Sequence, residues 1–382
     1  MNNWIPLSTP TFEGNEWNYV KECIDTGWVS SVGQFVNRFE EEIANFTGAN
    51  YAIATMNGTS ALHLSLLLAG VQPGDAVIIP SLTFVATANA VAYLGAEPIL
   101  IDSKSDTWQM DLDLLSEFLE FNTYTKNKVC LLKDSGQKIG AIVPVHVLGN
   151  LVDMDHLCSL AERFQIPVVE DSTEALGSTL NGKHAGTFGL FGTLSFNGNK
   201  LITTGGGGMI LTNQPILAQK AKHLTTQAKA DPLEYFHDEI GFNYRLVNIL
   251  AAIGVAQLEK IPNFLDKHHT IFEIYKNGLA FLPGSSWQKS IPNASPNHWI
   301  TTICFPKADS LLQYLLHHKI QARKFWVPMH MLPMFKSNRY IHRENISERL
   351  YNNAISLPSS SNLSAENQDF IIRKILEFYD QA

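Results

Sequence analysis

The sequence predicts an α/β protein with a mostly parallel central sheet flanked by helices, followed by a smaller C-terminal α/β domain. Three observations support this fold class. Short β-branched runs alternate with helical patterns between residue 50 and about residue 215, as in βαβ units. Beyond residue 261 the pattern becomes irregular and is punctuated by proline. The 382 residues, 45% of them hydrophobic, suffice for about two domains with a sizeable core.

In chain order, the first predicted element is an amphipathic helix, because Phe35, Phe39 and Ile43 recur at helical spacing. The predicted strands are YAIAT at 51–55, AVIIP at 76–80, EPILID at 97–102, GAIVPVHV at 140–147, PVVED at 167–171, TLSF at 193–196 and GMILT at 208–212. The helices predicted between these strands are TSALHLSLLLAG at 59–70 and DMDHLCSLAERF at 153–164. This alternation indicates a parallel sheet.

One long helix is expected from about residue 246 to residue 261. The composition changes after it, which predicts a large domain over 1–261 and a small domain over 262–382. The small domain is expected to end in the helix ENQDFIIRKILEFYD.

Composition and charge exclude several classes of function. The net charge is −8 and no basic stripe is present, so nucleic acid is not an expected partner. The start of the sequence lacks the pattern of a signal peptide, and no apolar run reaches the length of a membrane span. We therefore expect a cytoplasmic protein without a membrane partner. Neither the four scattered cysteines nor the adjacent histidine pairs have metal-ligand spacing, so no metal is expected.

Ligands of open α/β sheets bind beyond the carboxyl ends of the strands, which directs attention to the residues after each strand. Gly58, Thr59 and Ser60 lead from a strand into a helix, where exposed N–H groups and hydroxyls suit a phosphate. The same residues also suit an ordinary helix cap. Phe84 follows the next strand, where its ring can cover a planar ligand or fill the core.

Two ionisable residues stand at later strand ends. Asp171 closes an apolar strand and requires either water or a positive partner, for which a pyridinium nitrogen is suitable. Lys200 precedes a run of four glycines, 205–208, that permits close approach of a bound group. Its amine can form a Schiff base, whereas the alternative is a solvated surface charge.

These strand ends occur together with TGWVSSVG at 26–33, GFNYR at 241–245 and RKFWVPMH at 323–330. In order and spacing they resemble the DegT/StrS family of sugar aminotransferases over essentially the whole chain. The resemblance implies the type I fold of pyridoxal phosphate (PLP)-dependent transferases, with PLP or its amine form as cofactor.

The resemblance also implies residue roles. Lys200 matches the lysine that binds the cofactor as a Schiff base, is released as a free amine and then moves a proton. Asp171 matches the carboxylate on the pyridine nitrogen, and Phe84 matches the residue stacked on the ring. The implied phosphate contacts are Gly58, Thr59, Ser60, Ser195 and, from the neighbouring subunit, Asn243. A homodimer with active sites at the subunit interface is therefore expected.

Two departures from the common family pattern suggest a substrate. Glu174 stands where most of the family has glutamine, and Gly206 stands where many members have glutamate. Both features resemble the bacillosamine and legionaminic acid branch, which aminates UDP-linked 4-keto-6-deoxy-N-acetylglucosamine in bacterial polysaccharide biosynthesis. Glutamate is the implied amino donor and 2-oxoglutarate the by-product.

Several alternatives remain open at this stage. The keto sugar can instead be linked to GDP, as in perosamine synthesis, or to dTDP. A dehydratase relative would carry histidine in place of Lys200. A non-catalytic PLP-binding homologue would lack Lys200 or Asp171, and both are present. Lys324 and His330 are candidate substrate contacts, or else a surface pair beside a buried Trp326.

Overall fold

A computed structural model describes residues 4–231 and 233–380 of the protein. The central sheet contains eight strands. In spatial order they are β1 (Tyr51–Thr55), β11 (Gly208–Thr212), β10 (Phe191–Ser195), β7 (Val169–Asp171), β6 (Ile139–Ile142), β2 (Ala76–Pro80), β3 (Glu97–Ile101) and β18 (Tyr340–Ile341). The single bridges Ile142–Val168 and Val145–Asp171 join the two halves of this sheet. Only β11 runs antiparallel to its neighbours, so the prediction of a mostly parallel sheet is confirmed.

Helices cover both faces of the sheet. The helices of the described chain, including those of the C-terminal part, are α1 (Glu16–Thr26), α2 (Gln34–Thr47), α3 (Gly58–Leu68), α4 (Val85–Tyr93), α5 (Leu112–Asn122), α6 (Met154–Phe164), α7 (Pro215–Thr225), α8 (Asn248–Leu258), α9 (Ile261–Gly278), α10 (Ala308–His317), α11 (Ile346–Asn353) and α12 (Ala365–Asp380). Successive residues of β2 face opposite sides, so Val77 packs with α3, α4 and α7, and Ile78 packs with α5 and α6. Burial on both sides explains why the β2 sequence is apolar throughout.

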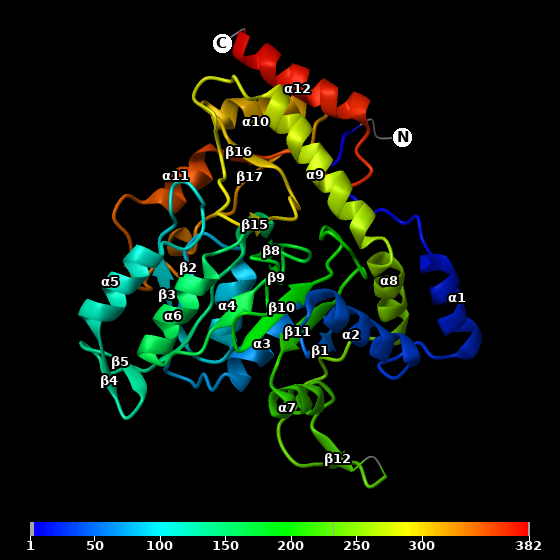
Figure 1. Cartoon of the computed structure of the whole chain (residues 1–382), viewed down its shortest axis with the longest axis vertical. Helices are drawn as coiled ribbons and strands as arrows, with labels where there is room; N and C mark the ends of the chain where they lie inside the picture. Colours follow the sequence, from blue (N-terminus) through cyan, green and yellow to red (C-terminus); the bar gives the residue numbers. More distant parts are fainter. Residues whose placement is uncertain (1–3, 232, 381–382) are drawn as a thin grey trace.

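The C-terminal part forms a second, smaller sheet beyond α9 (Figure 1). Its strands, in spatial order, are β14 (Ser286–Trp287), β16 (Thr302–Cys304), β19 (Ala354–Ser356) and β17 (Arg323–Lys324). The helices α9, α10 and α12 pack with these strands in a core of their own. The division between residues 261 and 262 stays a prediction. Two strand pairings cross it, since β18 joins the central sheet and β15 (Ala294–Ser295) pairs with β8 (Thr179–Leu180).

Two sequence predictions differ from the observed elements. The helix expected from about 246 to 261 is α8, which is shorter at both ends; the next helix, α9, begins at Ile261 with Pro262 in its first turn. The strand expected over 140–147 stops at Ile142, because Pro144 cannot donate to a sheet ladder. The chain then enters a short 3₁₀ turn, Val147–Gly149, close to the carboxyl end of β7.

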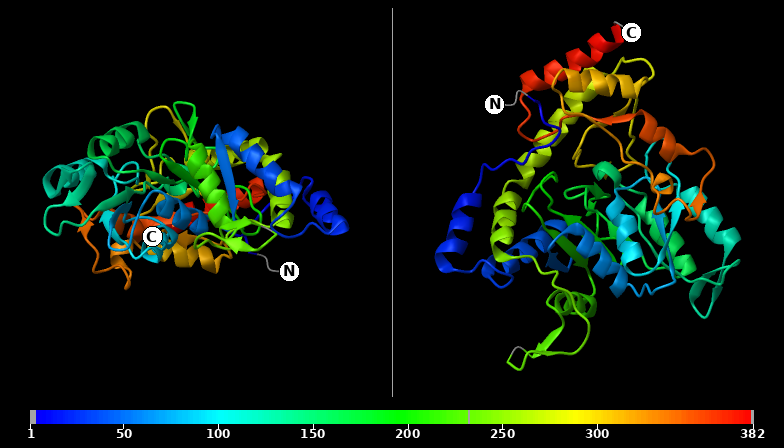
Figure 2. Two further views of the ribbon diagram at one scale, coloured as in Figure 1. Left: turned by 90° about the horizontal axis from the view of Figure 1, so that it is seen from below. Right: turned by 180° about the vertical axis from the view of Figure 1, so that it is seen from behind.

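The remaining strands are short hairpins at the periphery. They are β4 (Thr123–Lys126) with β5 (Val129–Leu132), β8 with β9 (Lys183–His184), and β12 (Lys229–Asp231) with β13 (Phe236–His237). The last hairpin projects from the body beyond α7 (Figures 1 and 2). At the opposite end of the molecule, the N-terminal segment lies against the small sheet region through the Ile5–Ile320 bridge. No helix in the described part of the chain is long and apolar enough to cross a membrane.

Candidate active site

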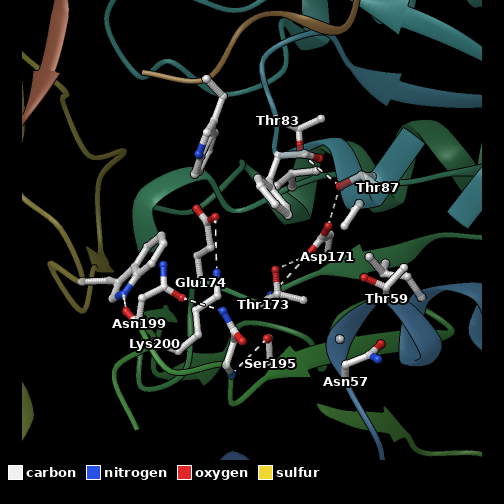
Figure 3. A pocket seen from close by; sticks show the side chains of 18 of the residues that line it. Asn57, Thr59, Thr83, Thr87, Asp171, Thr173, Glu174, Ser195, Asn199 and Lys200 are labelled. Carbon is white, nitrogen blue, oxygen red and sulfur yellow. Dashed lines mark hydrogen bonds and ion pairs between the residues drawn. The ribbon is translucent and has the colours of Figure 1, made fainter. Parts of the chain in front are cut away.

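A pocket of about 430 Å³ lies at the carboxyl ends of β1, β2, β7 and β10. It brings together the predicted residues Gly58, Thr59, Phe84, Asp171, Glu174, Ser195 and Lys200. Figure 3 shows the side chains of Thr59, Asp171, Glu174, Ser195 and Lys200 around this pocket. The strand-end positions that the sequence singled out therefore form one site.

The N-terminus of α3 forms one wall of the pocket. Asn57 caps this helix, because its side-chain oxygen accepts a hydrogen bond from the Ser60 N–H at 2.8 Å. Within the described chain, the N–H groups of Gly58 and Thr59 have no acceptor. A Cβ atom on Gly58 would lie 3.0 Å from the Ser195 Cβ atom, so glycine keeps the space between helix and strand open. This wall suits an anion such as a phosphate.

Asp171 lies on the floor of the pocket and is 3% exposed. Its carboxylate accepts hydrogen bonds from the hydroxyls of Thr87 and Thr173, each at 2.7 Å. Figure 3 shows these two threonines on either side of the acid. No ion pair involves Asp171 among residues 4–231 and 233–380. A buried carboxylate with hydroxyl donors and pocket access favours a cationic ligand group.

Lys200 reaches the pocket from the loop after β10, and its side chain is 14% exposed. The ammonium nitrogen Nζ lies 3.5 Å from the Glu174 Oε1 atom. It also lies 4.1 Å from the centre of the Trp299 ring, a cation–π distance. Lys200 is therefore not the solvated surface charge that the alternative interpretation required.

Glu174 is held in place by the turn that follows β6. Its Oε2 atom accepts a hydrogen bond from the Leu148 N–H at 2.8 Å. Leu148 has a φ angle of 61°, a left-handed conformation that is uncommon for leucine and that belongs to this turn. Burial raises the pKa of Glu174 to about 7, against the lowering effect of the Lys200 charge and the Leu148 hydrogen bond. A carboxyl group with this pKa can exchange a proton near neutral pH.

The mouth of the pocket carries two aromatic rings and a cation. Phe84 is 54% exposed, and its ring centre lies 6.2 Å from that of Trp326. Arg323 and Lys200 are the cationic side chains among the described residues that line the pocket. An arginine at the mouth of a pocket can pair with a carboxylate or phosphate of a substrate.

Other predicted residues lie outside the lining of this pocket. Ser60 is buried in the first turn of α3, and Asn243 is exposed on the segment after the β12–β13 hairpin. Lys324 forms an ion pair with Asp309 at 2.8 Å and lies over the ring of Tyr351. Adjacent residues of a strand point to opposite sides, so Arg323 reaches the pocket in place of Lys324.

His330 also lies outside the lining. Its Nδ1 atom is 2.7 Å from the Ser81 hydroxyl oxygen, and its ring stacks on Tyr340 with centres 3.9 Å apart. These two contacts within the chain are enough to explain the position of the His330 ring, without a contact to substrate. Trp326, which the alternative interpretation expected to be buried, instead lines the pocket.

Sequence reasoning missed several residues of the site. The sequence could have identified Thr87 and Thr173, because both follow predicted strand ends and carry hydroxyls that can bond to a neighbouring acid. Trp299 and Arg323 had no comparable signal, because they come from the irregular C-terminal part and reach the pocket only through tertiary packing.

The donor set of the pocket fits PLP. An open helix N-terminus with adjacent hydroxyls can hold the phosphate, and the buried Asp171 can hold a protonated ring nitrogen. Lys200 brings an amine into the same pocket, and an amine can bind the aldehyde of this cofactor.

Solved structures and sequence relatives agree with this fit. A crystal structure of a DegT DnrJ EryC1 StrS aminotransferase from Brucella abortus superposes with a TM-score of 0.87, at 27% identity over 95% of each chain. EpsN of Bacillus subtilis, which carries the provisional name of a PLP-dependent aminotransferase, is 39% identical over 99% of this chain and 97% of EpsN. The GDP-perosamine synthase of Escherichia coli O157:H7 is 38% identical over 98% of this chain and 99% of that protein.

The fold and the site define a PLP-dependent aminotransferase with the type I fold. The model of the DegT/DnrJ/EryC1/StrS aminotransferase family matches residues 10–376. The chain belongs to this family, as the strand-end motifs predicted.

Proposed function

We propose that the protein transfers the amino group of glutamate to the C4 keto group of a GDP-linked 4-keto-6-deoxy sugar. The observation that carries the chemistry is the meeting of Lys200, Asp171 and the open N-terminus of α3 in one pocket. The name of the GDP-perosamine synthase relative supports the GDP-linked sugar. This support reverses the order of our sequence interpretations, in which the UDP-linked sugar came first and the GDP-linked sugar was the alternative.

Each residue has a defined task in this proposal. PLP, when bound, supplies an electron sink that eases proton transfer at the carbon bearing the amino group. Asp171 keeps positive charge on the ring nitrogen, and the α3 N-terminus with Thr59 and Ser195 binds the phosphate. Lys200 accepts and returns a proton at its Nζ atom.

Three remaining residues would orient the bound groups. Phe84 would cover the ring, as the resemblance implies, and Glu174, which lies beside Lys200, would contact the cofactor. Arg323 pairs with an anionic group of glutamate or of the nucleotide sugar.

The second candidate function is that of a regulatory or sensory homologue without catalytic activity. Such a homologue would lack Lys200 or Asp171, or would hold them apart. Both residues line the same pocket, which favours the enzyme.

The substrate test compares three keto sugars that differ in the nucleotide. Purified protein with PLP and glutamate receives GDP-, UDP- or dTDP-linked 4-keto-6-deoxy sugar, and the amino product and 2-oxoglutarate are measured. We expect kcat/KM to be higher by at least about 10-fold for the GDP-linked sugar, because the three substrates differ in the base, in the 2′-hydroxyl that dTDP lacks and in the N-acetyl group of the UDP-linked sugar. A preference for the UDP-linked sugar would restore the first interpretation, and turnover of none of the three would contradict the proposal.

We also propose that the protein is a homodimer whose subunits share their active sites. Asn243 is exposed and lies outside the pocket of its own chain, as expected for a residue that serves the neighbouring site. Large apolar side chains are exposed on α1 and its following loop, and on the projecting hairpin: Trp17, Trp28, Val32, Leu233, Tyr235, Phe236 and Ile240. Exposed apolar surface of this kind is typical of subunit contacts.

Co-expression of two defective chains tests the shared site. The Lys200→Ala and Asn243→Asp homodimers are both expected to be impaired, the second because a carboxylate repels the cofactor phosphate. A mixed dimer regains one intact site, so statistical assortment should restore about a quarter of wild-type activity. Light scattering shows that each sample is dimeric, and native mass spectrometry distinguishes the mixed dimer from the two homodimers by mass. No recovery in a confirmed mixed dimer would show that Asn243 acts within its own subunit.

A further inference from the structure

We propose that Trp299 and Glu174 form a holding site for the side-chain ammonium of Lys200, with Trp299 acting as a positioning residue. The holding site would keep the amine at the pocket whenever it is not bound to the cofactor. The inference rests on the proposed aminotransferase function, in which Lys200 is released and must then return a proton.

The geometry of this site is two-sided. The Lys200 Nζ atom lies between the Glu174 Oε1 atom at 3.5 Å and the Trp299 ring at 4.1 Å from its centre. The carboxylate supplies a charge partner, and the ring face supplies its negative quadrupole. Both partners are almost fully buried, at 5% and 4% exposure, so water screens neither contact strongly.

Trp299 is fixed by hydrogen bonds near both Lys200 and Glu174. Its indole Nε1–H donates to the carbonyl oxygen of Asn199, the residue before Lys200, at 2.6 Å. Its backbone N–H donates to the Asn297 side-chain oxygen at 3.0 Å. The Asn297 amide nitrogen in turn donates to the Glu174 carbonyl oxygen at 2.8 Å. The two sides of the holding site are therefore tied together through Asn297.

A flexible lysine requires such a site. The four-carbon side chain of Lys200 has many rotamers, and its release from a covalent bond would let the amine leave the reacting atoms. Proton transfer needs the donor within hydrogen-bond reach of the acceptor. Two partners that attract the ammonium limit this motion without forming a covalent bond.

The charge of Glu174 depends on pH near neutrality. The groups that face its carboxylate are the Lys200 ammonium, the nearby Asp171 carboxylate and the Leu148 N–H. Because burial raises the pKa of Glu174 to about 7, its charge holds Lys200 above this pH and is lost below it. The attraction to the Trp299 ring does not depend on the protonation of Glu174, so it persists at lower pH.

The test measures how the reactivity of the Lys200 amine changes with pH. The full-length chain is prepared in its pyridoxamine phosphate form and freed of cofactor, and is treated with an amine-acylating reagent. Mass spectrometry of the Lys200 peptide gives the rate. We expect Trp299→Leu to move the midpoint of this profile to lower pH by about half a unit, since the ammonium loses its ring partner. Glu174→Gln should move it in the same direction by about one unit.

Two further variants separate positioning from a structural effect. Trp299→Phe keeps an aromatic face and should shift the midpoint less than Trp299→Leu. Trp326→Leu removes another pocket tryptophan that has no described contact with Lys200, and should leave the midpoint unchanged.

The sign of the shift decides the outcome. If Trp299 only excluded water, its replacement by leucine would favour the ammonium and raise the midpoint. A raised or unchanged midpoint in Trp299→Leu would overturn the proposal. The cofactor-free profile does not depend on turnover, so an inactive wild-type enzyme with the expected shift would reject the proposed function alone.

Discussion

Replacing Lys200 by alanine is expected to abolish transamination while leaving the protein folded. In the proposed function the amine is both the covalent partner of the cofactor and the group that moves the proton, so we expect turnover to fall by about 10⁴-fold or more. Arg323, the other described cation of the pocket, comes from the C-terminal part and has a guanidinium that stays protonated, so it cannot replace a free amine. Single-turnover formation of the 4-amino sugar measures the loss.

The stability of this variant should change little. Loss of Lys200 removes the ion pair with Glu174, but a carboxyl whose pKa burial already raises to about 7 can take up a proton instead of remaining charged. Lys183→Ala is a suitable control, because Lys183 lies over the Phe188 ring and does not line the pocket. The control should keep full activity. Turnover of Lys200→Ala within about 10-fold of wild type would reject the assigned role, because general acid–base catalysis alone contributes more.

The central part of this fold was predictable because its signals are local. The bounds of β1, β2 and β11 coincide with the predicted strands, since β-branched runs bounded by turns identify buried strands. Asp171 and Lys200 could be placed together from the sequence, because the carboxyl ends of neighbouring strands meet at one edge.

The rest of the site depends on interactions that no local pattern encodes. The strand that carries Arg323 and Lys324 has only those two residues, too few for an alternation that shows which one faces the pocket. Trp299 comes from an irregular segment and is aligned by hydrogen bonds to Asn199 and Asn297. Leu148, whose φ angle of 61° no local sequence pattern predicts, provides the N–H that holds Glu174.

Replacing Asp171 by asparagine is expected to weaken cofactor retention and to slow turnover by about 10²-fold or more. The substitution keeps the size of the side chain but removes the charge that, in the proposed function, holds a proton on the ring nitrogen. In the native chain the hydroxyls of Thr87 and Thr173 donate to the two carboxylate oxygens. The asparagine amide would present N–H groups to one of these hydroxyls, so that donor would face another donor. Dialysis followed by cofactor assay measures retention, and steady-state kinetics measure turnover.

Thr173→Val is the matched variant, because it removes one hydrogen bond to the carboxylate at 2.7 Å and leaves the charge in place. If the charge is the decisive property, Thr173→Val should reduce turnover by only about 10-fold, the cost of about one hydrogen bond to a charged group. Equal losses in both variants would mean that orientation of the acid matters more than its charge. Unchanged turnover in Asp171→Asn would mean that the ring nitrogen needs no anionic partner here, and the electron-sink role of Asp171 would then have to be abandoned.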